Sequence, residues 1–490
     1  MTTVLVTLSI AIAMAGLLAH HKLQAKRHII GAIAVNLFLN FIAFLQWKPV
    51  LPTAALLAGY YLGPFPEQKK ELHLTWLSAF LFLFCFKFVR IVVHIISYLL
   101  YKPAVMAKNP KFAAKDVTVV IPSFGDFDAH FDFCLGTILR NFPAEVIIST
   151  VGEDKFQLAS RVCKKYASQG LRVIQTDEPN KRKQFAAGVD AAKTSIVACV
   201  DDSAFWGNEF LQNALIPFED AKVGLVGTVK RVTREKSDRP FSFALWKEEV
   251  RTHWIGDILN FIAVLYLERH NWECTATENI DGGVFVISGR TQFMFRSLFL
   301  KLKPGFLTET WLFGTVVLDN ADDDCHVTRW MVNNGYKCVF HNSPKALMHT
   351  RLGVIDGWTK FGGQCTRWVK STLRSNSTSL FADRTVWTTQ PWCTYAIHMT
   401  SLVNYAFFYD LALYLTLWFS PYGSAQNILR LAMVIFASKM YKIIPYYSRN
   451  PIDLWYIPVQ IGFGYYHSYI KLKALFDPKN ASWGTRAGVK

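Results

Sequence analysis

A five-residue stretch, Gln364-Cys365-Thr366-Arg367-Trp368, carries side chains that could bind a sugar and a diphosphate. If the stretch is helical, Gln364, Arg367 and Trp368 lie at i, i+3 and i+4 and share one face. An amide and an indole can dock a sugar, and a guanidinium can hold a diphosphate at two points. The aromatic and basic flanks also fit a helix at a membrane surface. An ordinary amphipathic helix is the alternative, so the stretch predicts a site only together with other features.

Asp201 and Asp202 are adjacent carboxylates at the end of a predicted strand. Carboxylate oxygens are hard ligands that suit Mg²⁺ or Mn²⁺, and either ion could also bridge a diphosphate. Acids that cap a helix or lie solvated in a loop would give the same pattern. The pair is therefore a candidate metal site that needs support from its surroundings.

A second acidic cluster consists of Asp322, Asp323 and Asp324, three like charges in a row. Because these charges repel one another, we expect at least one carboxyl to have a raised pKa or a cationic partner. A carboxylate in this cluster could take a proton from an acceptor hydroxyl. The cluster could also be an exposed N-cap of a helix over His326–Asn333, and both interpretations can hold together.

Two basic motifs add cations whose partners the sequence leaves open. Lys181-Arg182-Lys183 follows a predicted strand in a loop, where it could face nucleotide phosphates, although a solvated turn also fits a lone basic run. The segment Trp483–Arg486 offers an indole and a guanidinium on a C-terminal tail. Neither motif indicates a function by itself.

The elements that must position these groups alternate between strand and helix from about Lys102 to Arg374. The predicted strands are Val117–Ile121, Glu145–Thr150, Leu171–Gln175 and Ser195–Val200, with predicted helices at Asp132–Asn141 and Phe156–Gln169. This alternation predicts an α/β fold with an open, mostly parallel sheet that binds ligands at the carboxyl ends of its strands.

The chain as a whole is too apolar for a soluble enzyme of 490 residues, because mean hydropathy is +0.19 and Phe, Tyr and Trp number 38, 19 and 15. The candidate membrane spans are Met1–His20, Ile29–Trp47, Leu74–Leu100, Cys393–Phe419, Ile428–Ile444 and Leu454–Phe476. The run Leu51–Leu62 is shorter and is predicted to be re-entrant or a half-span. The net charge of +17 fits positive-inside loops, anionic lipid headgroups and an anionic sugar nucleotide, and no nucleic-acid motif is present. Nine scattered cysteines without a Cys-x-x-Cys pair argue against structural zinc and fit a reducing cytosolic setting.

The predicted span Leu74–Leu100 contains three basic side chains, Lys87, Arg90 and His94, which are costly in lipid. They either snorkel or face other helices, or they line a polymer channel. At the other end of the chain, Leu454–Phe476 is predicted to be re-entrant or interfacial, because lysines interrupt its last turns.

In this order, the motifs resemble those of the processive family 2 glycosyltransferases, which include hyaluronan, chitin and cellulose synthases. Gly363–Ser371 looks like the catalytic helix of hyaluronan synthases, and Asp323–Thr328 looks like their Gly-Asp-Asp-Arg-His-Leu-Thr segment. Asn180–Arg182 resembles their Lys-Arg loop, and Ser482–Arg486 is similar to the gating-loop motif of hyaluronan and chitin synthases. The resemblance runs from about Lys102 to the end and is strongest to small fungal cell-wall or capsule-type polysaccharide synthases.

The resemblance implies a GT-A-type α/β glycosyltransferase domain inserted between N- and C-terminal bundles of transmembrane helices. The implied regions are residues 1–101 for N-terminal transmembrane helices, 102–357 for the cytosolic GT-A-like domain, 358–392 for interfacial helices, 393–476 for C-terminal transmembrane or re-entrant helices and 477–490 for a cytosolic gating tail.

The resemblance also implies roles for individual residues. Asp324 would be the catalytic base, with Gln364, Arg367 and Trp368 beside it. The remaining implied residues are Pro122, Ser123, Phe124, Glu153, Lys181 and Arg182 for the nucleotide, Gly282 and Gly283 (before a predicted strand at Val284–Ile287) for the acceptor, Asp201 and Asp202 for the metal, and Trp483, Gly484, Thr485 and Arg486 for gating. The family's Asp-x-Asp pattern would place an aspartate where this chain has Ser203, so the individual metal ligands stay open.

The implied activity is inverting transfer from a UDP-sugar, with Mn²⁺ or Mg²⁺, to a nascent polysaccharide that the membrane helices conduct outward. The implied location is the plasma membrane, with the catalytic domain on the cytosolic side where UDP-sugars occur. The lipid bilayer is an expected partner, nucleic acid is not, and the oligomeric state stays open. A non-processive enzyme that makes a glycolipid, such as a ceramide glucosyltransferase, is the alternative, because it can share the Gln-x-x-Arg-Trp helix. A transporter or receptor with a cytosolic sheet domain would not need the ordered series of acidic and Trp motifs.

Overall fold

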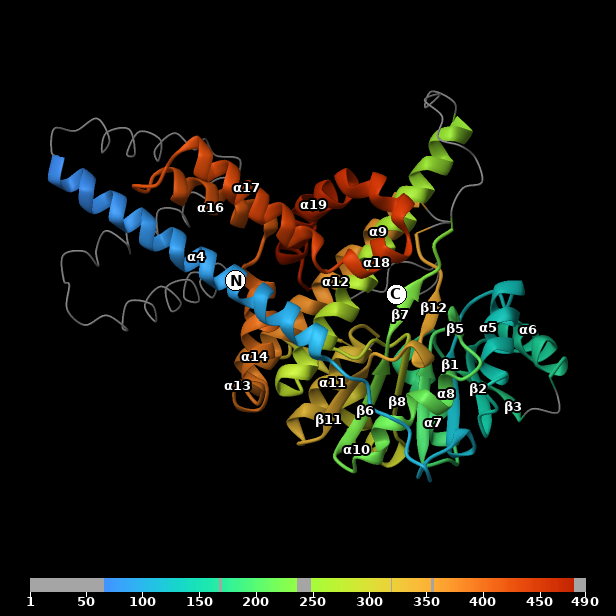
Figure 1. The fold of residues 1–490 in the computed structure, drawn as a ribbon. Coiled ribbons are helices and arrows are strands. Elements are labelled where there is room, and N and C mark those ends of the chain that lie inside the picture. The colour runs from blue at the N-terminus through green and yellow to red at the C-terminus, as the bar shows by residue number, and fades with distance from the viewer. Residues whose placement is uncertain (1–65, 167–169, 236–247, 319, 354–356, 480–490) are drawn as a thin grey trace. The chain divides into compact units, whose positions relative to one another are not determined.

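The computed structural model describes residues 66–166, 170–235, 248–318, 320–353 and 357–479. The spans predicted before residue 66 and the motif Trp483–Arg486 lie outside the described residues. The chain divides into two compact units, one of residues 1–86 with 411–433 and one of residues 87–410 with 434–490. The second unit holds all the strands of the described residues (Figure 1).

Seven strands of the second unit form one mixed sheet in the order β11-β6-β8-β4-β1-β2-β3. They are β1 (Val117–Pro122), β2 (Glu145–Val151), β3 (Leu171–Thr176), β4 (Ile196–Val200), β6 (Val223–Thr228), β8 (Thr291–Phe295) and β11 (Lys337–His341). β8 is antiparallel to both of its neighbours, and the other pairings in this sheet are parallel. The α/β fold with a mostly parallel sheet and the four strands predicted from sequence are therefore confirmed.

Helices cover both faces of the sheet because successive side chains of each strand point to opposite faces. In β1, Val117, Val119 and Ile121 pack into one apolar cluster, and Val120 packs into another. The first cluster includes residues of α5 (Ala129–Leu139), α6 (Glu153–Lys164) and α8 (Phe210–Ala214), and the second includes residues of α7 (Lys181–Ala191), α10 (Arg296–Leu307) and α11 (Asp323–Asn333).

Two smaller sheets accompany the main one. Strands β5 (Ala204–Trp206), β12 (Met348–Thr350) and β7 (Lys230–Val232) form a sheet in the order β5-β12-β7, and β9 (Thr310–Trp311) pairs with β10 (Val316–Val317). The predicted strand at Val284–Ile287 is wrong, because that segment is irregular and β8 begins later, at Thr291. The Ile287 N–H donates to the Thr328 hydroxyl at 3.0 Å instead of to a neighbouring strand.

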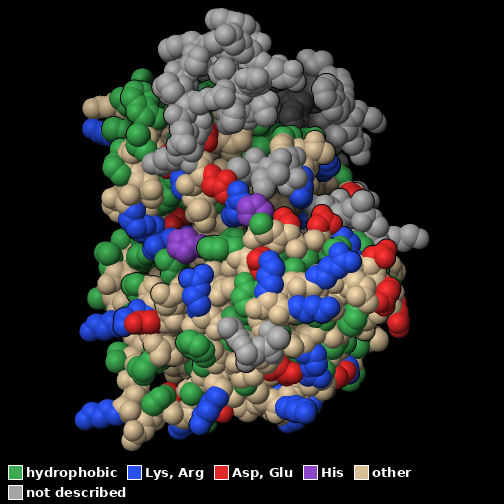
Figure 2. Space-filling model, turned by 90° about the vertical axis from the view of Figure 1, so that its right-hand side faces the viewer, with side chains coloured by type: hydrophobic (Ala, Val, Ile, Leu, Met, Phe, Trp, Pro, Cys, Tyr) green, Lys and Arg blue, Asp and Glu red, His purple; other side chains and the backbone are tan. Residues whose placement is uncertain are grey.

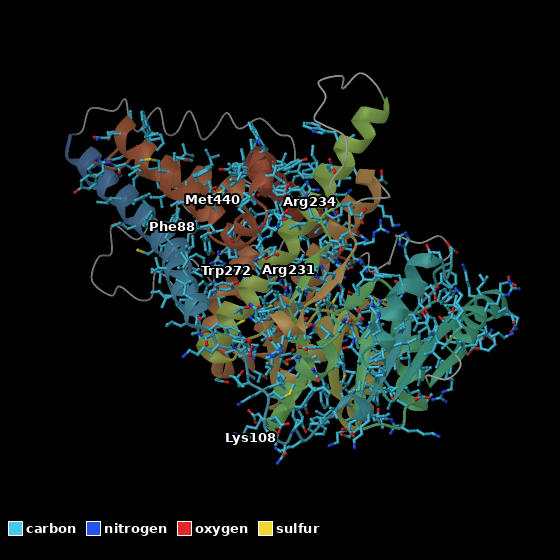
Figure 3. All side chains as sticks on the ribbon, turned by 45° about the vertical axis from the view of Figure 1, so that its right-hand side comes forward. Phe88, Lys108, Arg231, Arg234, Trp272 and Met440 are labelled. Carbon is cyan, nitrogen blue, oxygen red and sulfur yellow. The ribbon has the colours of Figure 1, made fainter. Side chains whose placement is uncertain are left out.

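A helical layer packs together beside these sheets within the second unit. Residues of α9 (Glu248–Asp281), α12 (Gly357–Ser377), α18 (Ile444–Arg449) and α19 (Ile457–Phe476) share one apolar cluster. Arg234, labelled in Figure 3, joins two parts of this layer. Its guanidinium donates to Asn260 Oδ1 at 3.0 Å and to Asp453 Oδ2 at 3.2 Å. The layer is therefore held by polar contacts as well as by apolar packing.

Between α12 and α19, further elements of at most 16 residues accompany α18. They are η4 (Thr378–Asp383), α13 (Val386–Thr389), α14 (Pro391–Cys393), η5 (Thr394–Met399), α15 (Thr400–Val403), α16 (Ala406–Trp418), α17 (Ala425–Met440) and η6 (Pro451–Tyr456). Three further short turns lie earlier in the chain, namely η1 (Ala114–Asp116), η2 (Ile216–Glu219) and η3 (Pro344–Ala346). The predicted single span Cys393–Phe419 is wrong, because helical structure breaks at Asn404. The Lys471 ammonium donates to the carbonyls of Ser401 and Asn404, both at 2.9 Å, and so satisfies oxygens that the break leaves open.

Helix α4 (Pro66–Leu100) contains the stretch Thr75–Leu100, which is long and apolar enough to cross a membrane. It is the one such stretch within the part of the chain that the structure describes. The predicted flanking bundles of transmembrane helices are therefore not supported by the described residues, although the helix predicted at Leu74–Leu100 is present.

Lys87, Arg90 and His94 face other helices, which was one of the two interpretations of Leu74–Leu100. Lys87 forms an ion pair with Asp410, and Arg90 donates to the Ala396 carbonyl at 2.8 Å. His94 is fully buried, and its Nδ1 lies 2.9 Å from Glu273 Oε2. All three side chains thus have polar partners inside the second unit.

The basic residues on the face shown in Figure 2 are scattered among acidic and uncharged side chains. On this face, the excess positive charge of the chain therefore does not gather into one continuous basic surface of the kind that follows a nucleic-acid backbone.

Candidate active site

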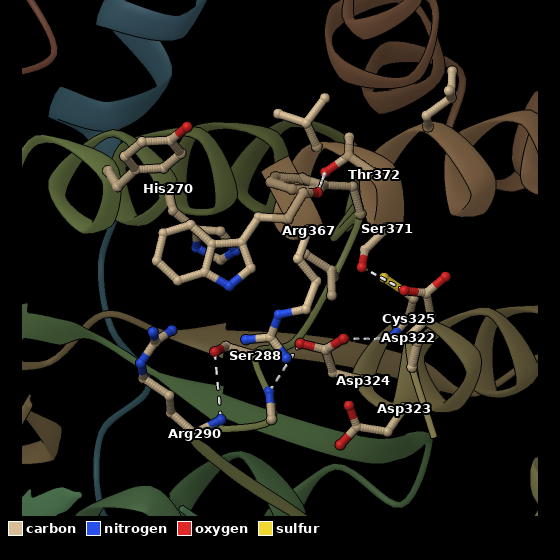
Figure 4. Close-up of a pocket in the computed structure, with 18 of the residues that line it drawn as sticks. His270, Ser288, Arg290, Asp322, Asp323, Asp324, Cys325, Arg367, Ser371 and Thr372 are labelled. Carbon is tan, nitrogen blue, oxygen red and sulfur yellow. Dashed lines mark hydrogen bonds between the residues drawn. The ribbon is translucent and has the colours of Figure 1, made fainter. Parts of the chain in front are cut away.

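A pocket of about 290 Å³ lies beside the carboxyl end of β4 (Figure 4). Its walls come from the first turns of α7 and α11, the loop before β8, and the sides of α9, α12 and α19. Five residues predicted for the site line it, namely Lys181, Asp201, Asp324, Arg367 and Trp368. The structure therefore brings together residues that are up to 187 positions apart in the chain.

The three adjacent carboxylates at the start of α11 have three different partners. Asp322 is the N-cap residue of the helix, in the left-handed conformation with φ at 60°. Its carboxylate accepts from Arg374 Nε at 2.6 Å and Nη2 at 2.9 Å, and also from the Ser371 hydroxyl. Asp322 is only 6% exposed, so the interpretation of an exposed cap is wrong. This buried pair ties α11 to α12.

Asp323 shares a cation with Asp201. The Lys181 ammonium lies 2.9 Å from Asp201 Oδ1 and 3.1 Å from Asp323 Oδ2. Burial alone would lower the pKa of Lys181, but the two carboxylates raise it well above its ordinary value. Burial would likewise raise the pKa of Asp201, but Lys181, Arg290 and Arg367 hold it below its ordinary value. Both Asp201 and Lys181 are therefore charged at neutral pH.

Asp324 is the member of the acidic cluster without an ion pair to any described residue. Its Oδ2 accepts from the Gly289 N–H at 3.1 Å, and its Oδ1 accepts from the Cys325 N–H at 2.8 Å. Burial raises the pKa of the Asp324 carboxyl, and the neighbouring Asp323 raises it further. The expectation that the cluster would contain a raised pKa or a cationic partner is confirmed on both counts. A carboxylate with a raised pKa in a pocket is suited to general-base chemistry.

The loop Ser288-Gly289-Arg290 positions this carboxylate and is itself fixed to the sheet. The Asp201 N–H donates to the Arg290 carbonyl at 2.9 Å, which joins the loop to the end of β4. A Cβ atom at Gly289 would lie 3.2 Å from both Asp323 Oδ2 and Lys181 Nζ. A side chain at this position would therefore crowd the acidic cluster and its lysine.

Helix α12 presents Arg367 and Trp368 to the pocket, and the helix predicted for this motif is confirmed. The Trp368 ring lies 5.2 Å from that of Tyr266, and the Arg290 guanidinium lies 5.4 Å from the Trp368 ring centre. Gln364 shares the helix but does not line the pocket. Its predicted role at the acceptor therefore stays a prediction.

The predicted Lys-Arg loop is instead the first turn of helix α7, whose N-cap residue is Asn180. Because neighbouring residues of a helix point in different directions, Lys181 reaches the pocket and Arg182 turns away from it. Arg182 is fully buried and donates to Glu309 Oε2 and to the Phe306 carbonyl, both at 2.6 Å. The expectation that Arg182 faces nucleotide phosphates is thus corrected, because its guanidinium is committed to Glu309.

Other predicted nucleotide residues lie at the same edge of the sheet but outside the pocket. Ser123 follows β1, and its hydroxyl donates to Asp202 Oδ2 at 2.7 Å. Asp202 therefore points toward β1, whereas the neighbouring Asp201 points into the pocket. The other members of this group, which also do not line the pocket, are Pro122, Phe124 and Glu153. Their contacts with a nucleotide stay predictions.

The two glycines predicted for acceptor binding do not line the pocket. Gly282 has a φ of 71°, which favours glycine, and a Cβ atom on Gly283 would lie 2.3 Å from Cys393 Cβ. The close approach at Gly283 is therefore to α14 and not to a ligand, which corrects the prediction. Gly289 is the glycine that lines the pocket.

Asp201 and Asp323 could hold a divalent cation. Their carboxylate oxygens converge on one cation, Lys181 Nζ, and are the hard donors that Mg²⁺ and Mn²⁺ prefer. The described residues contain no group of three or more metal-ligating side chains. Two carboxylates still fit, because Mg²⁺ is commonly held by one or two carboxylates together with substrate phosphates and water.

Several further residues line the pocket that the sequence motifs do not indicate. They include Lys230, Tyr266, His270, Arg290, Tyr405, His467 and Lys471. Two of these had a weak signal in the sequence. Lys230 interrupts the apolar run after β6, and Arg290 directly follows a Ser-Gly pair.

Three comparisons with known proteins bear on this site. Residues 114–371 match the family model described as glycosyltransferase like family 2. The chain is 35% identical to a Type 2 glycosyltransferase of Pyricularia oryzae, over 84% of this chain and 82% of that protein. It is also 33% identical to a Type 2 glycosyltransferase of Zymoseptoria tritici, over 85% of each chain.

Among solved structures, the mannosyltransferase PcManGT from Pyrobaculum calidifontis, in complex with GDP-Man and Mn²⁺, is similar. The match has a TM-score of 0.47 and 14% identity, and it covers 82% of this chain and 99% of that one. A likeness of this degree says nothing about the ligand of the present chain. The family match and the sheet together confirm the expected GT-A-like α/β fold.

Breaking the buried pair of Asp322 and Arg374 should destabilise the protein. Arg374→Met leaves a buried carboxylate without its cation, so we expect the free energy of unfolding to fall by about 3–5 kcal/mol. Thermal unfolding of the purified chain measures this loss. Lys370→Met on the same helix is the control, because its partner Asp477 is 57% exposed and the pair should contribute about 1 kcal/mol or less. Equal effects of the two variants would contradict the proposed importance of the buried pair.

Proposed function

The chain belongs to glycosyltransferase family 2, and from this premise we propose that it is a membrane-associated, inverting enzyme that uses a UDP-sugar to elongate a polysaccharide and export it. One observation carries the proposal. Asp324 lies in a pocket with the Lys181–Asp201–Asp323 cluster, Arg367 and Trp368, and it has a raised pKa. The pocket thus combines a base with groups suited to a diphosphate and a sugar.

In the proposed reaction, Asp324 removes the proton from an acceptor hydroxyl. The acceptor oxygen then forms a bond to the anomeric carbon of the donor from the side opposite the leaving group. The bond from that carbon to the phosphate oxygen breaks, and UDP leaves with the bonding electron pair. The Gly289 N–H keeps the Asp324 carboxylate aimed into the pocket throughout.

Charge on the departing diphosphate needs compensation from nearby cations. Arg367 lines the pocket and can donate to two phosphate oxygens at once. Asp201 and Asp323 would hold Mg²⁺ or Mn²⁺, and a bound ion of this kind neutralises charge as it develops on a diphosphate. Lys181 keeps the two carboxylates close together before the donor arrives.

Aromatic side chains in the pocket support a carbohydrate acceptor. Trp368, Tyr266, Tyr405 and His467 line it, and the rings of Tyr266 and His467 are 5.5 Å apart. Flat apolar rings with polar edges suit the stacking of successive sugar units. This feature favours a polysaccharide over a single glycolipid acceptor, although a lipid-linked sugar could use the same rings.

A membrane setting is part of the proposal. The apolar helix Thr75–Leu100, the mean hydropathy of +0.19 and the net charge of +17 support it. We place the enzyme in the plasma membrane with its catalytic unit in the cytosol, because UDP-sugars are cytosolic. The tail that begins after residue 476 is proposed to close over the pocket when the donor is bound.

The proposal is tested by incubating the purified full chain with a panel of UDP- and GDP-sugars. We expect UDP release with one UDP-sugar, a product of many sugar units, and loss of activity in excess chelator that Mn²⁺ or Mg²⁺ restores. A single added sugar on lipid would establish the glycolipid alternative. Release from GDP-sugars alone would overturn the choice of donor, and full activity in chelator would remove the metal from the mechanism.

Asp324→Asn should abolish sugar transfer while leaving nucleotide binding largely intact. An amide cannot act as the base, and its one oxygen can still accept from Gly289 or from Cys325, so one of the two backbone bonds that hold the side chain is kept. Turnover and nucleotide affinity are measured on the same preparation. Asp190→Asn, an exposed acid on α7 that pairs with Lys303, is the control and should keep its activity. Turnover in Asp324→Asn equal to that of the unmodified enzyme would show that another group is the base.

Trp483→Ala should lower turnover strongly at unchanged protein level, if the tail excludes water from the loaded pocket. The substitution leaves every charge in place, so a tail that merely binds anionic lipid would not be affected. Trp455→Ala is the matched control, because this indole is 86% exposed and should contribute little to turnover. Polymer synthesis at the normal rate by Trp483→Ala would rule out the gating role.

A further inference from the structure

Two cations that line the pocket have no anionic partner among the described residues. The Lys230 ammonium makes no hydrogen bond or ion pair with any described side chain or carbonyl, and Lys230 is only 2% exposed. The Arg290 guanidinium likewise forms no ion pair with a described carboxylate: it lies 5.4 Å from the Trp368 ring centre, and Asp201 and Asp324 act on it only from beyond ion-pair distance. These two differ from Lys181, which is committed to Asp201 and Asp323.

The backbone of Lys230 has a structural role that its side chain does not share. Asn271 Nδ2 donates to the Lys230 carbonyl at 2.7 Å, which fastens β7 to α9. Strand alternation then directs Lys230 inward and Arg231 outward, where Arg231 pairs with Glu268 at 3.5 Å. The inward direction brings the ammonium to the pocket wall without giving it a partner.

A buried ammonium without a counterion costs free energy in the unliganded protein. Burial lowers the pKa of Lys230 to about 7, and the positive charge of Arg290 contributes to this shift. The pKa of Arg290 is itself lowered by burial and by Arg367. An anion in the pocket would relieve this repulsion and favour the charged form of Lys230.

The position of Arg290 indicates which anion this would be. Its carbonyl accepts from the Asp201 N–H, so the residue is fixed beside the carboxylate that would hold a metal. Among charged side chains, Arg290 interacts with Asp201, Arg367 and Asp324. In the view of Figure 4, the guanidinium groups of Arg290 and Arg367 lie on the two sides of Ser288. The cations thus face the donor side of the pocket.

We propose that Lys230 and Arg290 form a preformed site for the diphosphate of the nucleotide-sugar donor and for the nucleoside diphosphate that leaves. Arg290 supplies a planar fork of donors that Trp368 keeps in place, and Lys230 supplies a point charge at the pocket wall. Lys181 acts mainly as a spacer between Asp201 and Asp323. This inference rests on the proposed function for the identity of the ligand, but it concerns binding alone.

The test measures nucleotide binding by the full chain, purified in detergent, without acceptor or added metal. Calorimetric titration with UDP, UMP, GDP and GMP first shows which base the unmodified protein prefers. Lys230→Met and Arg290→Met should then each weaken binding of that diphosphate roughly ten- to a hundredfold, and should weaken binding of the monophosphate less. Arg231→Met, on the outward face of the same strand, should bind like the unmodified protein.

Thermal unfolding separates this role from a structural one. Without nucleotide, Lys230→Met should unfold at the same or a higher temperature, because a buried unpaired charge has been removed. Its stabilisation by saturating diphosphate should be smaller than that of the unmodified protein. Arg290→Lys should recover part of the affinity that Arg290→Met loses, since it restores the charge without the planar fork.

Unchanged diphosphate affinity in both methionine variants would overturn the inference and leave the proposed function standing. A lower unfolding temperature of Lys230→Met without nucleotide would also overturn it, because the side chain would then have a structural role. If the unmodified chain binds a nucleoside diphosphate as described but transfers no sugar to any acceptor, the proposed function fails and the binding site stands.

Discussion

The negative charges of three adjacent carboxylates at the start of α11 each need their own partners. The positions of these partners determine the arrangement of the pocket. Asp322 takes Arg374 and Ser371 from α12, and Asp323 takes Lys181 from α7. Asp324 has only backbone N–H groups as partners. The positive end of the helix dipole favours all three charges at this position. The contacts of Asp322 and Asp323 fix α12 and α7, two walls of the pocket, to the start of α11. The same turn of α11 carries Asp324, so the walls and the reactive carboxylate are positioned together.

The chain repeats this principle elsewhere, because it has 53 Lys and Arg residues for 36 Asp and Glu residues. Buried acids therefore serve several cations at once. Glu309 contacts Arg182, His326 and Arg329. Burial would raise the pKa of Glu309, but these three side chains hold it well below its ordinary value. Such an acid joins α7 to α11, and replacing it would leave the buried Arg182 without its carboxylate partner.

Much of the site could be predicted from local sequence. A few neighbouring residues are enough to predict three of its features. These are the strands of β-branched residues, the aspartates directly after β4 and the Arg367-Trp368 pair on one helix. The predictions that the structure contradicts depend on partners that lie far away in the sequence. The glycine at position 283 predicts close approach of a ligand to the backbone, but the side chain that approaches it is that of Cys393, 110 positions later. The break at Asn404 is stabilised by Lys471, and an apolar run shows neither the break nor its partner.

Lys181 and Arg182 show that a basic motif does not predict which of its side chains faces the pocket. Both stand in one basic run, yet the first turn of α7 points them in different directions, one toward the pocket and one toward Glu309. Arginine suits the buried position because its planar group satisfies Glu309 and two carbonyls at once. Lysine suits the pocket because a compact charge can sit between two carboxylates. Whether a cation remains available to a ligand thus depends on whether the fold brings an acid within ion-pair distance of it, and at Lys230 and Arg290 no described acid comes that close.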